Sequence, residues 1–73
     1  MIEIWVNDHH SHRERIKCNP SDTIGDLKKL IAFKIGTRPE KIRLHHANKV
    51  LSDNVTLDDY EIHQGTQLTM SYQ

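Results

Sequence analysis

Cysteine, glycine and aromatic residues are scarce in the chain, and each scarcity argues against a class of function. One cysteine, Cys18, cannot form a disulfide within the chain and fits a reducing compartment. Because Cys18 alternates with Ile16 in a strand pattern, we expect a buried packing residue, not a nucleophile. The three glycines form no glycine-rich phosphate loop. Aromatic residues, at 5% of the chain, are too few to interleave with basic residues for base stacking.

The charges and the hydropathy also exclude classes of function. Ten basic and ten acidic residues cancel, so the net charge favours neither nucleic acid nor membrane as a partner. No apolar run is long enough to span a membrane or to act as a secretory signal. No nucleophile and base are paired convincingly, which argues against an enzyme. We expect a soluble intracellular protein.

The length allows one domain with a small core, spanning residues 1–73. Alternation of apolar and polar residues predicts five strands, at residues 2–7, 13–18, 42–44, 50–51 and 68–72. The first two strands are joined by a turn at residues 8–12, and we expect Ile16 and Cys18 to point inward.

Residues 23–35 carry the signals of one amphipathic helix. Thr23 can accept the first free N–H groups, and Asp26, three residues later, resembles the second half of a capping box. Apolar residues spaced by three and four predict a buried stripe, made of Ile24, Leu27, Leu30 and Ile31. Gly36 stands where a left-handed C-cap is expected.

Residues 57–62 predict a tight turn, in which we expect the Tyr60 hydroxyl to be an internal hydrogen-bond anchor. The helix start at residues 21–29 and this turn, in this order between a hairpin and a final strand, resemble the ubiquitin-like fold. The resemblance covers nearly the whole chain. It implies an α+β fold of the β-grasp type, in which a mixed five-stranded sheet packs on one helix.

Short segments spread along the chain carry a closer resemblance. They are Met1–Glu3, Asn7–Asp8, Lys17–Cys18, Gly25–Lys29, Gly36–Thr37, Lys41–Ile42, Asp59–His63 and Tyr72–Gln73. Together they resemble the Hub-type ubiquitin-like proteins (the ubiquitin-like protein 5, or beacon, family). Three places depart from the family pattern. The turn at residues 9–12 lacks the usual glycine, Trp5 replaces a smaller residue, and Ser71 replaces a tyrosine. These departures concern the hairpin and not the fold.

The resemblance implies a protein-binding module that is not an enzyme. Hub-type proteins look like non-covalent modifiers that clasp a short helix, the HIND element, of spliceosomal proteins and so modulate pre-mRNA splicing in the nucleus and cytoplasm. The family's acidic contact to an arginine of that helix falls on Asp22, although Asp22 could equally serve only the helix dipole or the turn. A second surface, toward a splicing RNA helicase, falls on His63. The resemblance also implies a monomer with no cofactor, no metal, no direct contact with nucleic acid and no membrane contact.

A covalently conjugated tag is the main alternative. Conjugation needs a flexible tail ending in glycine, because only a residue without a side chain fits the narrow channels of the transfer enzymes. Here the last glycine is Gly65, inside the predicted fold, and the bulky Tyr72 is expected to hinder transfer. Non-covalent docking is therefore the favoured interpretation.

The surface that ubiquitin uses for recognition is expected to be polar here. The positions of its apolar patch are occupied by His9, His45, Thr69 and Ser71, so helices that bind ubiquitin should lose most of their apolar burial. Phe33 and Ile35 lie off the main stripe of the helix. They could add an exposed apolar contact or simply cover the edge of the core.

The six histidines suggest another alternative, a variant that responds to metal or pH through its hairpin. His10 and His12, with Asp8 nearby, could hold copper, nickel or zinc weakly, but a structural site needs four fixed ligands. A solvated polar turn is the expected state. An RNA-binding patch is a further possibility, made of Lys28, Lys29, Lys34, Arg38, Lys41 and Arg43, although lysines on a helix exterior usually serve solubility.

Overall fold

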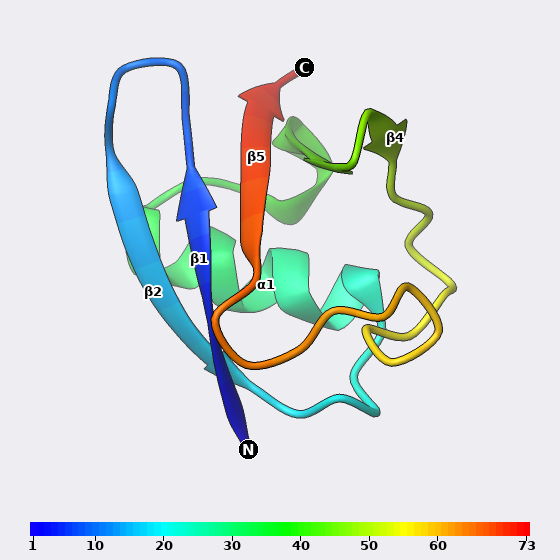
Figure 1. The fold of residues 1–73 in the computed structure, drawn as a ribbon. Coiled ribbons are helices and arrows are strands. Elements are labelled where there is room, and N and C mark those ends of the chain that lie inside the picture. The colour runs from blue at the N-terminus through cyan, green and yellow to red at the C-terminus, as the bar shows by residue number, and fades with distance from the viewer.

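The computed structural model describes residues 1–73 as one sheet with one long helix across it (Figure 1). The elements are β1 (Ile2–Asn7), β2 (Arg13–Cys18), α1 (Ile24–Ile35), the short 3-10 helix η1 (Pro39–Lys41), β3 (Ile42–His46), β4 (Lys49–Val50) and β5 (Gln67–Tyr72). The predicted α+β architecture, a mixed five-stranded sheet packed on one helix, is confirmed.

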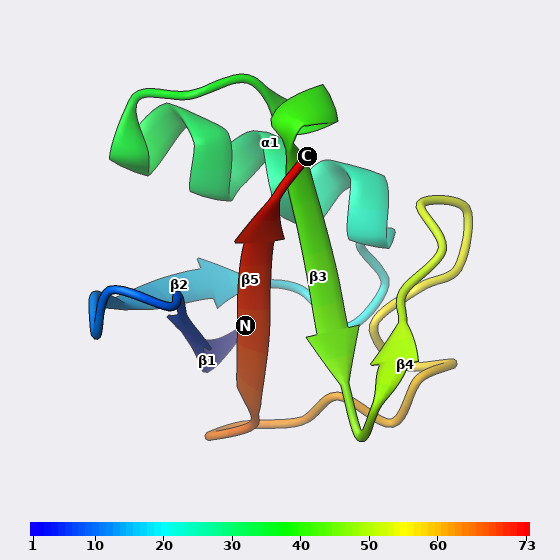
Figure 2. The same cartoon turned by 90° about the horizontal axis from the view of Figure 1, so that it is seen from above.

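Strand β5 lies at the centre of the sheet, whose order is β2-β1-β5-β3-β4. It runs parallel to β1, with Val6 opposite Leu68, and antiparallel to β3, with Leu44 opposite Met70. Helix α1 crosses one face of this sheet, behind the strands in Figure 1 and above them in Figure 2. Strands β2 and β4 form the two edges.

The core lies between the helix and the sheet and contains fifteen buried apolar residues. Ile16 and Cys18 point inward, as predicted. The predicted stripe is correct for Ile24, Leu27 and Ile31, but Leu30 is 44% exposed, so its assignment to the core was wrong. At about 100° of rotation per residue, Leu30 lies beyond the edge of the buried face.

Lys28 takes a place on the other flank of that face. Its stem is buried, while its Nζ lies 2.7 Å from Oδ1 of Asp53. A buried stem with its charged end paired at the surface is the usual arrangement of a long basic side chain.

Local signals set both ends of α1. Thr23 Oγ1 accepts a hydrogen bond from the Asp26 N–H at 3.1 Å, and Asp26 Oδ2 accepts one from the Thr23 N–H at 3.2 Å. This reciprocal pair is the predicted capping box. Gly36 ends the helix with φ at 79°, a left-handed conformation that glycine adopts without a side-chain clash.

The turn at residues 57–62 is anchored as predicted. The Tyr60 hydroxyl accepts a hydrogen bond from the Ser52 N–H at 2.9 Å, which ties the turn to the segment that follows β4. This bond comes first among the causes that lower the pKa of Tyr60, because an N–H aimed at the oxygen favours the phenolate.

The residues that follow β5 are also held. The Gln73 N–H donates to the Lys41 carbonyl at 2.9 Å, and Gln73 Oε1 accepts from Arg43 at 3.0 Å. Separately, α1 is too short and too polar to cross a membrane, and no other helix is longer.

Replacing Tyr60 with phenylalanine keeps the ring and removes the acceptor for the Ser52 N–H. We expect the free energy of unfolding to fall by about 1 kcal/mol, the usual net contribution of one hydrogen bond. Urea denaturation followed by the fluorescence of Trp5 measures the change. Tyr72→Phe is the control, because the Tyr72 side chain is exposed. Equal stability of the Tyr60→Phe variant and the parent would show that the bond contributes nothing.

Candidate functional site

An apolar cleft lies between β2 and the outer side of α1. Its apolar lining comes from Ile16, Leu30 and Phe33, and it encloses about 390 Å³. The Phe33 side chain is 92% exposed. A phenylalanine and a leucine exposed together on one helix indicate an interaction surface, because isolated exposure of this size is costly in water.

Basic residues form the rim of this cleft. Arg15 and Lys17 come from β2, and Lys34 comes from α1. The Lys34 Nζ donates to the Arg15 carbonyl at 2.9 Å, so the helix caps one carbonyl of the edge strand. Arg15 also lies 3.4 Å from Glu3, a pair that is largely solvated. The β2–α1 cleft therefore combines apolar walls with positive charge.

Asp22 lies in the connection between β2 and α1, the two walls of this cleft. Its carboxylate was expected to be exposed, but the residue is half-buried. Its Oδ2 accepts a hydrogen bond from the Asn19 N–H at 2.9 Å, and its own N–H donates to the Asn19 carbonyl. Asp22 thus closes a turn. A carboxylate has about four acceptor positions, so it retains capacity for a partner.

The Asp22 charge also acts on the cysteine. Burial, with a smaller contribution from Asp22, raises the pKa of the Cys18 thiol to about 11. The thiol is therefore protonated at neutral pH, as expected of an inert packing residue.

His63 is exposed and follows the turn at residues 57–62. Its N–H donates to Thr66 Oγ1 and its carbonyl accepts from the Thr66 N–H, both at 3.0 Å. The connection that carries Asp22 and the one that carries His63 both lie at the lower end of the sheet in Figure 1. Neither residue lines the β2–α1 cleft.

The expected polar surface is present on the other face of the sheet. His9, His45, Thr69 and Ser71 line one shallow hollow, in which Ala47 is the one apolar residue. The His45 Nε2 lies 3.0 Å from Ser71 Oγ. This hollow offers polar contacts where an apolar patch would bind a hydrophobic helix.

The histidine hairpin is organised around Asp8. Its Oδ1 accepts from the N–H groups of His10 and His12, each at 2.9 Å, and its Oδ2 lies 3.2 Å from the His12 Nδ1. The rings of His10 and His12 are 6.5 Å apart, centre to centre. No three His, Cys, Asp or Glu side chains are grouped to hold a metal ion.

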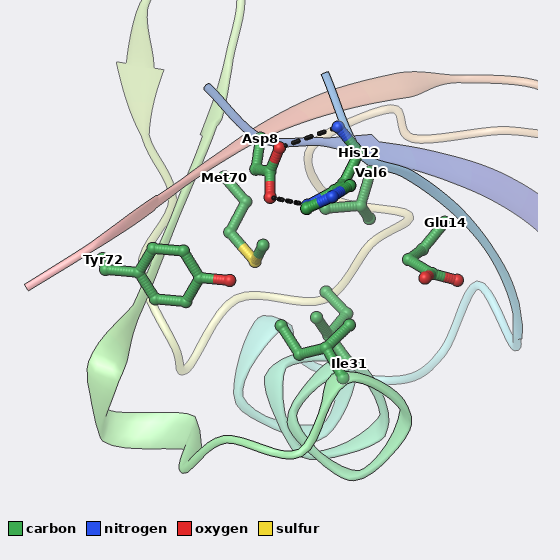
Figure 3. Close-up of a pocket in the computed structure, with 8 residues that line it drawn as sticks. Val6, Asp8, His12, Glu14, Ile31, Met70 and Tyr72 are labelled. Atoms are coloured by element: carbon green, nitrogen blue, oxygen red, sulfur yellow. Dashed lines mark hydrogen bonds and ion pairs between the residues drawn. The ribbon is translucent and has the colours of Figure 1, made fainter. Parts of the chain in front are cut away.

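A second cleft opens between this hairpin, the end of β5 and α1 (Figure 3). Its apolar walls come from Val6, Ile31, Ile35, Met70 and Tyr72. The polar residues are Asp8, His12 and Glu14. Carboxylates against apolar walls make this hairpin cleft opposite in charge to the β2–α1 cleft.

Three of the basic residues that could have formed an RNA-binding patch make contacts within the chain. Lys28 is paired with Asp53, and Arg43 donates to Gln73 at 3.0 Å. Lys34 donates to a backbone carbonyl. These contacts are those of structural and solubilising charges.

Sequence reasoning anticipated part of the apolar surface. Of the two alternatives predicted for Phe33 and Ile35, an exposed apolar contact applies to Phe33, which is exposed. Covering the edge of the core applies to Ile35, which is half-buried against it. The partner of Phe33 in the cleft, Leu30, was missed. The signal in the sequence was the position of Leu30 three residues before Phe33, on the polar side of the helix.

Comparisons with known proteins agree along the whole chain. The ubiquitin family model matches residues 6–72. Ubiquitin-like protein 5 of Drosophila melanogaster is 53% identical over 73 residues, which is 100% of each chain. The ubiquitin-like modifier hub1 of Schizosaccharomyces pombe is 50% identical over 72 residues, and HUB1 of Saccharomyces cerevisiae is 44% identical over 72, each alignment covering 99% of both chains.

The Asp8 carboxyl gives a testable pH dependence. Burial acts to raise its pKa, but the N–H groups of His12 and His10 and the His12 ring together hold it below the ordinary value of 3.8. A depressed pKa stabilises the fold above the ordinary value, and this contribution is lost as the pH falls through the folded pKa. We expect the Asp8 carboxyl signal in NMR to titrate with a midpoint below 3.8, and the amide signals of His10 and His12 to move with it.

His12→Gln should raise that midpoint, because it removes the ring contact and keeps the backbone N–H. His63→Gln, at the other end of the sheet, is the control and should leave it unchanged. A midpoint at or above 3.8 in the parent protein would contradict the assigned role of Asp8.

Proposed function

The chain belongs to the ubiquitin family, as a homologue of the Ubiquitin-like protein 5 and HUB1 proteins, and on this basis we propose that it works by non-covalent docking. Two of these relatives bear the name ubiquitin-like modifier. The proposed ligands are short HIND-type helices of spliceosomal proteins, and the proposed effect is modulation of pre-mRNA splicing. The β2–α1 cleft is the observation that carries this proposal.

The apolar lining of the cleft supports a helical ligand. Covering a fully exposed phenylalanine side chain contributes roughly 1.5–3 kcal/mol, which makes Phe33 the main anchor. An amphipathic helix would present apolar side chains three and four residues apart to Phe33 and Leu30. Acidic side chains of the same helix would face Arg15 and Lys17.

The position of Asp22 supports an arginine in the same ligand. Phe33 lies nine residues after the helix start at Ile24, roughly 14 Å along the axis. A docked helix of about three turns would span this distance and bring a guanidinium to the Asp22 carboxylate, where a charge-assisted bond can form. His63 belongs to a proposed second surface for a splicing RNA helicase, for which its exposed ring is available.

The end of β5 is packed into the fold, as in a rigid binding module. Met70 is buried, Ser71 contacts His45, and the Gln73 N–H is bonded to Lys41. These residues are therefore held as part of the fold. We therefore propose a non-catalytic binding protein of the nucleus and cytoplasm, which acts by capturing a helix of its partner.

Asp22→Ala tests the charged contact. Titration with a synthetic HIND-type peptide in a calorimeter should show a loss of roughly 1–3 kcal/mol in binding free energy, the range for a hydrogen bond to a charged group. Glu40→Ala, which removes an exposed acid on η1, is the matched control. Unchanged affinity of the Asp22→Ala variant would remove Asp22 from the site.

Phe33→Ala tests the cleft with the same peptide. We expect a loss of more than about 1 kcal/mol in binding free energy, as for a buried anchor residue. Because Phe33 is exposed in the free protein, its removal should leave the thermal midpoint nearly unchanged. Val50→Ala changes an exposed apolar residue on β4 and should bind as the parent does. Equal binding by the Phe33→Ala and Val50→Ala variants would refute docking in this cleft.

A further inference from the structure

The hairpin cleft takes no part in the proposed docking of a HIND-type helix. It encloses about 370 Å³ between the strands and α1. Figure 3 shows the Tyr72 ring reaching into this space, with Ile31 on the helix side and Asp8 on the strand side. The cleft is therefore lined mainly by apolar residues and carries two carboxylates, Asp8 and Glu14.

The two carboxylates differ in how far they are already satisfied. The Asp8 side chain is 5% exposed, and three donors from the hairpin contact it. Glu14 is 38% exposed, and its one charged neighbour, the Lys34 Nζ, lies 3.9 Å away, beyond hydrogen-bond distance. Glu14 thus retains oxygen positions that can accept further hydrogen bonds. The nearly buried Asp8 adds a second negative charge to the cleft.

We propose that the hairpin cleft binds a long basic side chain, arginine or lysine, presented by a partner protein. The aliphatic stem of such a side chain matches the accessible apolar surface of Ile35 and Tyr72. Its cationic end reaches Glu14, with Asp8 behind it. A neutral aliphatic side chain would leave the charged Glu14 without a partner, and an acidic one would be repelled.

His12 modulates this site. Its side chain is 77% exposed, so the ring can turn away from Asp8 and give up its place to an incoming cation. The charged or titratable groups around the cleft are Asp8, His12, Glu14, Lys34 and Tyr72, with His10 beside His12.

The hairpin cleft is distinct from the β2–α1 cleft, and Lys34 stands between the two. The β2–α1 cleft has a rim of Arg15, Lys17 and Lys34 and selects acidic groups, whereas the hairpin cleft selects a cation. Signals from Leu30 and Phe33 report one cleft, and signals from Ile35 and Tyr72 report the other. Failure of either proposal can thus be recognised without the other.

N-acetylarginine N-methylamide is a suitable probe, and N-acetylcitrulline N-methylamide is its uncharged match. Both are added to the labelled protein at neutral pH and followed by NMR. We expect saturable shifts around Glu14, Ile35 and Tyr72 with the arginine probe. Its affinity should exceed that of the citrulline probe by at least about fivefold, because the guanidinium forms charge-assisted bonds.

Glu14→Gln should reduce the affinity for the arginine probe by at least about fivefold, since the charge-assisted bond is lost. Glu40→Gln is the control, because Glu40 is exposed on η1, away from the cleft. Asp8→Asn is not used as a test of the cation site, because the loss of the Asp8 charge can also loosen the hairpin. Equal binding of the two probes, shifts centred on Phe33, or no saturable shift at the cleft would each overturn the proposal.

Discussion

The pairing of β5 with two strands of opposite direction is the constraint on which the rest of the structure depends. Parallel pairing with β1 and antiparallel pairing with β3 bring both ends of the chain into one sheet. Leu68 and Met70 then point toward α1 and close the core. Strand β5 pairs with β1 over residues 67–69 and with β3 over residues 69–72, and the Gln73 N–H is bonded to the Lys41 carbonyl at the end of η1. Residues 67–73 are therefore part of the fold.

Strand β2 explains why two clefts of opposite charge flank one helix. Successive side chains on a strand point to opposite faces. Ile16 and Cys18 therefore enter the core, Glu14 turns toward the hairpin cleft, and Arg15 and Lys17 line the β2–α1 cleft. Helix α1 supplies an apolar wall to each, with Ile35 on one side and Phe33 on the other. One alternating strand and one helix thus create two clefts whose linings differ in charge.

Local sequence signals were sufficient wherever the contact is short in sequence. The capping box of Thr23 and Asp26, the left-handed Gly36 and the anchoring Tyr60 are each set within eight residues of the chain, and each is confirmed. Contacts between distant segments were not accessible. The Lys28–Asp53 pair, the clefts and the partial burial of Asp22 depend on how the sheet brings loops together. Leu30 was misassigned because spacing alone does not fix where a buried stripe ends.

The central claim is that this member of the ubiquitin family acts by reversible docking. The most direct test is to express the chain with an N-terminal tag in cells that splice pre-mRNA. The protein is then recovered under native conditions and, in parallel, after boiling in SDS with reductant, and both samples are analysed by mass spectrometry. Docking predicts spliceosomal partners in the native sample and the unmodified chain alone in the denatured one. A denaturation-resistant species with an isopeptide bond from this chain to another protein would contradict the account.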